Sequence, residues 1–220
     1  MVISVNSKNN KHRMKKLITL GYLLIFAITT AQAQQYFPSE VWHEGSVTIV
    51  DGESYRGKIK YNLEADLIQF SANNTIKTFS AQKLIFFEIF DAEYGRYREF
   101  YALPYQVSGD YKTPRLFEVL YENTLTLLCR EEIVQQTAPI NDPFFYGNQM
   151  MTRFRLDYQY YFLDRDGDIQ YFSQKKDDLY DMFPRNKAKV EQYVKKNKLK
   201  PDRQRDLVRV TAYYNSLLNS

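Results

Sequence analysis

The sequence predicts an α+β protein, in which a predominantly antiparallel β-sheet or partly closed barrel spans about residues 41–173 and three short C-terminal helices pack on it. Two periodicities predict this class. Apolar and polar residues alternate in short segments up to about residue 173, as in strands with one buried face. From residue 174 onward, apolar residues recur every three or four positions, as on one face of a helix. The 19 Tyr and 15 Phe also favour strands.

Residues 1–33 have the composition of a signal peptide. Five basic residues precede the apolar run 17–28, and Ala31-Gln32-Ala33 has the small-x-small form of a cleavage site. The run is shorter than the roughly 20 residues of a membrane span. We therefore expect a mature chain that starts at Gln34, is exported to the periplasm or secreted, and has no membrane span. An uncleaved anchor is the alternative, and Met14 is an alternative start.

The chain is thus predicted to comprise a signal peptide (1–33), an antiparallel β-domain (34–173) and a C-terminal helical cap (174–220). The mature chain holds 25 of the 30 Lys and Arg and all 26 Asp and Glu, with a net charge of −7 on the β-domain and +6 on the cap. The two parts could attract each other, or the cap could meet an anionic surface. Nucleic acid is not expected as the partner of an exported chain.

The first hairpin is predicted over residues 42–61, where two alternating segments flank Asp51-Gly52. An Asp-Gly pair between such segments favours a type I′ turn, because that turn needs positive φ at both central residues. Asn73-Asn74 predicts a second tight turn, since Asn tolerates positive φ.

Three later stretches have distinct patterns. Residues 84–90, LIFFEIF, predict a central strand that is covered on both faces. The proline-bracketed residues 104–114 predict a loop. Residues 135–152 predict a long irregular stretch, because Pro139 and Pro143 disfavour a regular interior strand.

The aromatic triplet Phe144, Phe145 and Tyr146 lies in the middle of this irregular stretch. Long loops without secondary structure are often functional. We therefore predict these three side chains as the binding residues. The alternative is that they fold back onto the sheet as a plug.

The last predicted hairpin, over residues 155–173, turns at Asp164-Arg165-Asp166-Gly167. Its aspartates resemble the start of a calcium-binding loop. Gly167 comes one residue too early for that loop, however, and Lys175 stands where the loop requires Glu. A β-turn explains the same residues, so no metal site is predicted.

Three amphipathic helices are predicted after the last strand, over residues 175–183, 186–197 and 201–217. Pro184 should end the first, and Asn186 should cap the second. Each has one narrow apolar stripe and must therefore dock on the sheet or on another helix.

Motifs for the common catalytic and cofactor sites are absent from the mature sequence, so no catalytic residue and no cofactor are predicted. Its single histidine is His43, which we place at the surface or at a cap position where the first strand begins. Its single cysteine, Cys129, lies in an apolar run and should be buried. Glu88 within LIFFEIF is the best candidate for a carboxyl group with a raised pKa, because burial disfavours its charge. Alternatively, Glu88 faces water or pairs with an arginine such as Arg98.

Two sets of motifs resemble an uncharacterised family of bacterial exported proteins. The C-terminal set, from residue 161 to the last helix, comprises LDRDGDI, KKDDLYDMFP, KVEQYVKKNKL and YYNSLL. The N-terminal set is W-x-x-G-x-V and G-x-I-x-Y within residues 42–61. Together they cover under half of the mature chain. The resemblance implies export and a β-then-α layout, and it carries over no site residue, since the family has no assigned activity.

These observations predict a non-enzymatic exported protein, a binding or structural module of the cell envelope. Its partner would be another envelope protein or a glycan. The alternative is a carboxylate-dependent hydrolase that acts on envelope or extracellular glycans, with Glu88 as its central acid.

Overall fold

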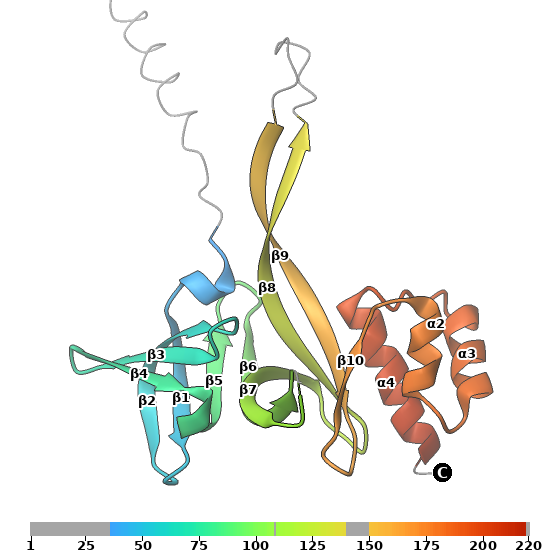
Figure 1. Ribbon diagram of the computed structural model, residues 1–220, viewed down its shortest axis with the longest axis horizontal. Coiled ribbons are helices and arrows are strands. Elements are labelled where there is room, and N and C mark those ends of the chain that lie inside the picture. The colour runs from blue at the N-terminus through green and yellow to red at the C-terminus, as the bar shows by residue number, and fades with distance from the viewer. Residues whose placement is uncertain (1–35, 108, 140–149, 219–220) are drawn as a thin grey trace, which may run out of the picture. The chain divides into compact units, whose positions relative to one another are not determined.

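The computed structural model describes residues 36–107, 109–139 and 150–218 (Figure 1). The predicted signal peptide lies outside the described residues. In the described part of the chain, ten strands form one antiparallel sheet and three α-helices follow them. The predicted α+β class is confirmed.

The strands follow one another along the chain, most of them joined by short turns. They are β1 (His43–Ile49), β2 (Ser54–Asn62), β3 (Leu67–Ala72), β4 (Thr75–Ser80), β5 (Leu84–Asp91), β6 (Arg96–Gln106), β7 (Lys112–Tyr121), β8 (Thr126–Pro139), β9 (Met150–Leu163) and β10 (Ile169–Phe172). Two 3-10 turns, η1 (Pro38–Glu40) and η2 (Ala81–Lys83), precede β1 and β5. The order across the sheet is β10-β9-β8-β7-β6-β5-β1-β2-β3-β4, so β10 and β4 are its edges and the sheet does not close into a barrel.

The buried side chains form two main clusters. The first, which we call the N-terminal core, comes from strands β1 to β7 and includes Val47, Ile59, Tyr61, Ile68, Phe87, Ile89, Phe100 and Leu116. The second, the C-terminal core, combines strands β8 to β10 with the helices and includes Leu127, Cys129, Tyr160, Phe162, Phe172, Phe183, Val190, Leu207 and Tyr214. The helices therefore share one core with the end of the sheet on which they pack.

The helices match the three amphipathic segments of the sequence. They are α2 (Lys176–Leu179), which continues as the 3-10 turn η3 (Tyr180–Met182), α3 (Lys187–Lys196) and α4 (Gln204–Leu218). All three lie beside β10 in Figure 1. Asn186 is the N-cap of α3, as predicted, but it has a φ of 63° and makes no side-chain capping bond.

The turn of the first hairpin differs from the prediction. The Gly52 N–H donates to the Ile49 carbonyl at 2.9 Å, and Gly52 has a φ of 84° whereas Asp51 has no positive φ. The loop therefore has three residues and ends in a left-handed glycine, which is the alternative hairpin geometry to the type I′ turn. Two successive positive φ values occur instead at Asn73 and Asn74, where β3 meets β4.

Strand β5 is central, but only one of its faces is buried. Phe87 and Ile89 are fully buried, whereas Ile85 and Phe90 on the strand are exposed. The prediction that residues 84–90 are covered on both faces is therefore wrong. The helices follow β10 and pack against the other end of the sheet, so they do not cover this face.

Both predicted loops are shorter than expected. Residues 104–106 and 112–114 belong to β6 and β7, where Pro104 pairs with Pro114 so that the missing N–H donors fall on one rung of the ladder. Strands β8 and β9 likewise extend to Pro139 and back from Met150. Only residues 140–149 of the second predicted loop are not in these strands, and they lie outside the described residues.

Candidate functional site

Five polar or charged side chains from five strands meet in a buried group, which we call the Arg98 cluster. Its members are Tyr61 of β2, Asp91 of β5, Arg98 of β6, Glu118 of β7 and Glu131 of β8. Arg98, only 4% exposed, donates to both carboxylate oxygens of Glu118, at 2.9 and 2.7 Å. It also donates to Glu131 at 2.5 Å, to the Tyr61 hydroxyl at 3.1 Å and to Asp91 at 3.3 Å.

The charged members are buried because each lies on the same face of its strand as buried apolar residues two positions away. Asp91 follows Phe87 and Ile89 in steps of two residues, and Glu131 follows Leu127 and Cys129 in the same way. Side chains at i and i+2 of a strand share a face. Asp91 is therefore buried with the apolar residues of its face, whereas β8 is buried on both faces from Thr126 to Glu131.

The cluster also shows how strongly the sheet curls. The Tyr61 hydroxyl donates to Glu131 at 2.7 Å, although β2 and β8 are five strands apart in the sheet order. In a flat sheet, five strand spacings would separate them by about 24 Å. Tyr61 belongs to the N-terminal core, whereas Cys129, the cross-strand neighbour of Glu118, belongs to the C-terminal core. The Arg98 cluster therefore lies where the two cores meet.

The charges of the cluster are set by burial and by its internal bonds. Burial raises the pKa of Glu131, against the opposing effects of the Arg98 charge and of the Tyr61 hydroxyl. Burial alone would lower the pKa of Arg98, but the hydrogen bond and charge of Glu118, with Tyr61 and Glu131, raise it above its usual value. Burial raises the pKa of Tyr61 well above its usual range, so its hydroxyl remains a hydrogen-bond donor to Glu131.

A second ion-paired group fastens the turn between β2 and β3 to β7 and β8. Asp66, with a φ of 51°, accepts a hydrogen bond from the Leu116 N–H at 2.8 Å. Its carboxylate pairs with Arg130 at 2.7 Å and with Arg115 at 2.5 Å. Arg130 also donates to the backbone carbonyls of Leu63 and Leu116. These bonds join the β2–β3 turn to β7 and β8 and so stabilise the curl of the sheet.

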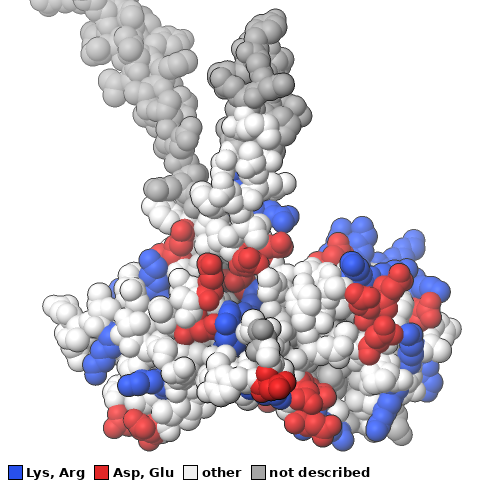
Figure 2. Space-filling model, viewed as in Figure 1, with Lys and Arg blue, Asp and Glu red and all other residues white. Residues whose placement is uncertain are grey.

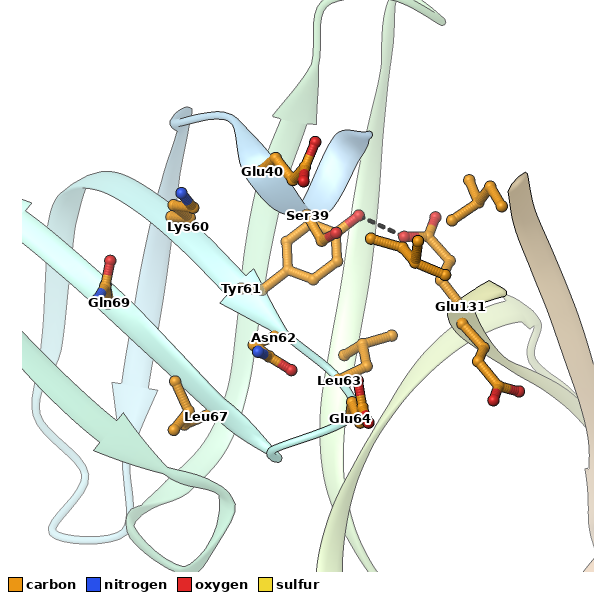
Figure 3. A pocket seen from close by; sticks show the side chains of 13 residues that line it. Ser39, Glu40, Lys60, Tyr61, Asn62, Leu63, Glu64, Leu67, Gln69 and Glu131 are labelled. Atoms are coloured by element: carbon orange, nitrogen blue, oxygen red, sulfur yellow. Dashed lines mark hydrogen bonds between the residues drawn. The ribbon is translucent and has the colours of Figure 1, made fainter. Parts of the chain in front are cut away.

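Glu131 borders two cavities. The first has a volume of about 320 Å³ and is lined by η1, β2, β3, β8 and β9. Figure 3 shows Tyr61 and Glu131 at this cavity, joined by their hydrogen bond. Its other charged lining residues are Glu40, Glu64, Glu132 and Lys60, which make it predominantly acidic.

The second cavity has a volume of about 580 Å³ and lies between the first turns of α4 and strands β6 to β9. Arg98, Glu118 and Glu131 contribute to its lining. The Arg98 cluster therefore reaches the walls of both cavities, although its side chains are bonded to one another.

The predicted acid, Glu88, is not part of the cluster. It is half-buried and pairs across the sheet with Ser46 and Glu99, whereas Arg98 pairs with Ile89 and faces the opposite side. The suggested contact between Glu88 and Arg98 is wrong, because neighbouring residues of a strand point to opposite faces.

The sequence analysis does not identify the three acids of the Arg98 cluster, Asp91, Glu118 and Glu131, as buried. Their two-residue phase with buried apolar neighbours was the signal that could have identified them.

His43 and Cys129 both belong to the interior. The ring of His43 is buried, its Nε2 lies 2.7 Å from the Pro38 carbonyl oxygen, and it stacks on Tyr61. Of the two predicted positions, the surface one is therefore wrong, whereas His43 does lie at the start of β1. Cys129 is fully buried, as predicted, and burial raises the pKa of its thiol. A buried neutral thiol is a poor nucleophile.

The aspartates between β9 and β10 form a hydrogen-bonded turn. Asp164 accepts from the backbone N–H groups of Asp166 and Asp168, at 2.9 and 3.0 Å. Asp168 pairs with Lys112 at 2.9 Å. Within the described residues, no group of three or more His, Cys, Asp or Glu is placed to hold a metal ion.

The predicted binding residues Phe144, Phe145 and Tyr146 lie outside the described residues. The strands on either side of them form a two-stranded extension, residues 132–139 and 150–157, which we call the β8–β9 arm (Figure 1). Strand β7 pairs with β8 only as far as Cys129, and β10 pairs with β9 only as far as Tyr160. Among the described strands, none pairs with the arm on either side.

The surface of the arm differs from that of the helices. Met150, Phe154 and Ile133 of the arm are 60%, 56% and 39% exposed. Figure 2 shows few charged atoms on the end of the described arm, whereas Lys and Arg side chains gather over the C-terminal helices. In the described part of the chain, the ion pairs of the helical segment join its own side chains.

Comparison with known proteins gives no relative for this chain. No protein-family model, no curated protein and no solved structure matches it. The resemblance to a family of exported proteins therefore stays a prediction from the quoted motifs. Among the described residues, no helix is long and apolar enough to cross a membrane.

Proposed function

We propose that this protein is an exported, non-enzymatic binding module of the cell envelope, which contacts another envelope protein through the β8–β9 arm. The observation that supports this most strongly is the arm itself. A two-stranded hairpin is only marginally stable in water by itself. An arm of this length, with Phe154 and Ile133 exposed, gains stability when a partner covers it.

The arm also offers the backbone groups that a protein partner can use. The outer edges of β8 and β9 in the arm pair with no other described strand. Such edges bind extended segments of other proteins by strand addition, with alternate side chains giving specificity. This favours a protein over a glycan as the partner.

The chemistry of the buried acids supports the non-enzymatic part of the proposal. Glu118 and Glu131 are both held by Arg98, and Glu131 also accepts from Tyr61. Glu131 borders both cavities, but each of its oxygens already accepts a hydrogen bond from the protein, whereas a general acid or nucleophile must bond to a substrate atom. The cluster is therefore organised as support for the fold.

Site-specific photocrosslinking tests the arm contact. In the native host, p-benzoylphenylalanine in place of Phe154 should give a discrete adduct with one envelope protein. The same residue in place of Ile76, which lies on β4 and is exposed to a similar degree, is the matched control and should give none. The absence of an adduct at position 154, or the same adducts at both positions, would refute the contact.

The export part of the proposal has its own test. Mass spectrometry of the protein from a native envelope fraction should find Gln34 as the first residue. A chain that retains residues 17–28, or one found only in the cytoplasmic fraction, would contradict export.

A carboxylate-dependent hydrolase is the second candidate. The observation that favours it is Glu131, which borders both cavities and has a pKa raised by burial. Turnover of a glycan or ester panel that is lost in Glu131→Gln but kept in Glu88→Gln would replace the binding proposal with this one. No turnover by the wild-type chain would remove the candidate.

A further inference from the structure

The cavity between α4 and strands β6 to β9 has the size of a small-molecule site. Its volume of about 580 Å³ falls within the range of roughly 300–1,000 Å³ that is typical of such sites. Arg98, Glu118 and Glu131 of the Arg98 cluster are part of its lining, and Arg98 pairs with both of these acids. Arg98 therefore offsets one of the two negative charges of these acids from within the protein.

Three further arginines line the cavity. Arg96, whose side chain is 51% exposed, lies 3.5 Å from Glu118, a longer separation than the bonds of Arg98. Arg205 and Arg209 are one turn apart on α4, and both are exposed. Arg209 lies 3.8 Å from Asp206, also a weak pairing. These guanidinium groups are available to an anion that enters the cavity.

The local backbone adds to the positive potential. Arg205 lies in the first turn of α4, which begins at Gln204, and Gln204 also lines the cavity. The N-terminal end of a helix carries a partial positive charge. Guanidinium groups bind phosphate and carboxylate oxygens with paired hydrogen bonds, so the same geometry suits either group.

The remaining wall is apolar and aromatic. Tyr94, Leu120, Tyr158 and Val208 line the cavity beside the arginines. Leu120, Tyr158 and Val208 are half-buried and so present apolar surface that is only partly covered. An inorganic anion would leave this surface uncovered.

We propose that this cavity binds a small organic anion. Its phosphate or carboxylate group pairs with Arg96, Arg205 and Arg209, and its apolar or aromatic part contacts Tyr94 and Tyr158. This site does not depend on the arm contact proposed above, because its arginines come from α4 and β6 and not from the arm.

Isothermal titration calorimetry of the mature chain with phenyl phosphate tests the site. We expect saturable binding that weakens as salt is added, since the contacts are ionic and partly exposed. Benzoate should compete if the site accepts a carboxylate as well. Inorganic phosphate and phenol, which each supply one half of the probe, should bind more weakly than phenyl phosphate.

Charge-removing variants locate the site. Arg205→Gln and Arg209→Gln should each weaken phenyl phosphate binding by about tenfold, because each removes a charged hydrogen bond. Arg203→Gln is the matched control, since Arg203 is exposed, lies two residues away and does not line the cavity. All three side chains are exposed, so the variants should keep the thermal midpoint of the wild type.

Two results would overturn the proposal. One is a heat of titration with phenyl phosphate that equals the heat of dilution. The other is binding that Arg203→Gln weakens as much as Arg205→Gln, which would indicate general attraction to the basic helices. Neither result would affect the photocrosslink at position 154.

Discussion

Arg98 is the single side chain on which the most buried groups depend. Its replacement by leucine would leave Asp91, Glu118 and Glu131 buried without their cation. Breaking a buried ion pair by removing one partner costs roughly 3–5 kcal/mol. We expect Arg98→Leu to lower the free energy of unfolding by about that amount, measured by urea denaturation.

Arg96→Leu is the matched control for this prediction. Arg96 is on the same strand, but its side chain is 51% exposed and 3.5 Å from Glu118. Because Arg96 is half exposed and Glu118 keeps its bonds to Arg98, loss of Arg96 should cost less than about 1 kcal/mol. Equal losses of stability in the two variants would mean that the buried cluster has no special weight in the fold.

The stability of the protein should depend on pH through Glu131. Because burial raises its folded-state pKa, the native state holds this proton more tightly than the unfolded chain does. The resulting stabilisation is complete below the ordinary pKa of 4.5 and is lost as the pH rises through the raised value.

Comparison with Glu131→Gln isolates this contribution, since the amide does not titrate, and its single oxygen can still accept one of the two hydrogen bonds. The wild type should gain stability relative to the variant when urea denaturation is repeated at acidic instead of neutral pH. If the difference in the free energy of unfolding between the wild type and Glu131→Gln is the same at both pH values, or changes in the opposite direction, the assigned direction of the pKa shift is contradicted.

At the level of single elements, the first hairpin depends on Gly52. Its φ of 84° is unfavourable for a β-branched residue, and no heavy atom lies within 4 Å of the position a Cβ would occupy. Gly52→Val should therefore destabilise through backbone strain alone, by about 1–3 kcal/mol. Gly52→Asn should cost less, because Asn tolerates positive φ. Equal thermal midpoints for the Val variant and the wild type would refute this turn geometry.

The sequence predicted most strands and all three helices because each has a clear apolar period. It did not predict the turn at Asp51-Gly52, since the same dipeptide suits both two-residue and three-residue loops. The sequence also predicts strands β6 to β9 that are too short, because Pro104, Pro114 and Pro139 indicate loops. In the structure, Pro104 and Pro114 pair within strands and Pro139 ends one.

The Arg98 cluster could not be predicted as a site, because its members are up to 70 residues apart in sequence. The phase of Asp91, Glu118 and Glu131 within their strands does indicate burial. It does not show that β2 reaches β8, which follows only from the curl of the whole sheet.

The whole molecule depends on the packing of the helices against the end of the sheet. Leu127, Phe162 and Phe172 of the strands are buried together with Phe183 and Leu207 of the helical segment. Truncation after residue 173 should expose this apolar surface and promote aggregation, as measured by light scattering. A soluble truncated chain with an unchanged thermal midpoint would instead make the helices a separate module.

The central claim is that the arm carries the function while the buried acids support the fold. The most direct test is the photocrosslink at position 154, measured in a chain that also carries Glu131→Gln. We expect the same adduct at the same yield as in the chain with Glu131 intact. Loss of the adduct while the chain remains folded would contradict it, because the function would then require the buried carboxylate.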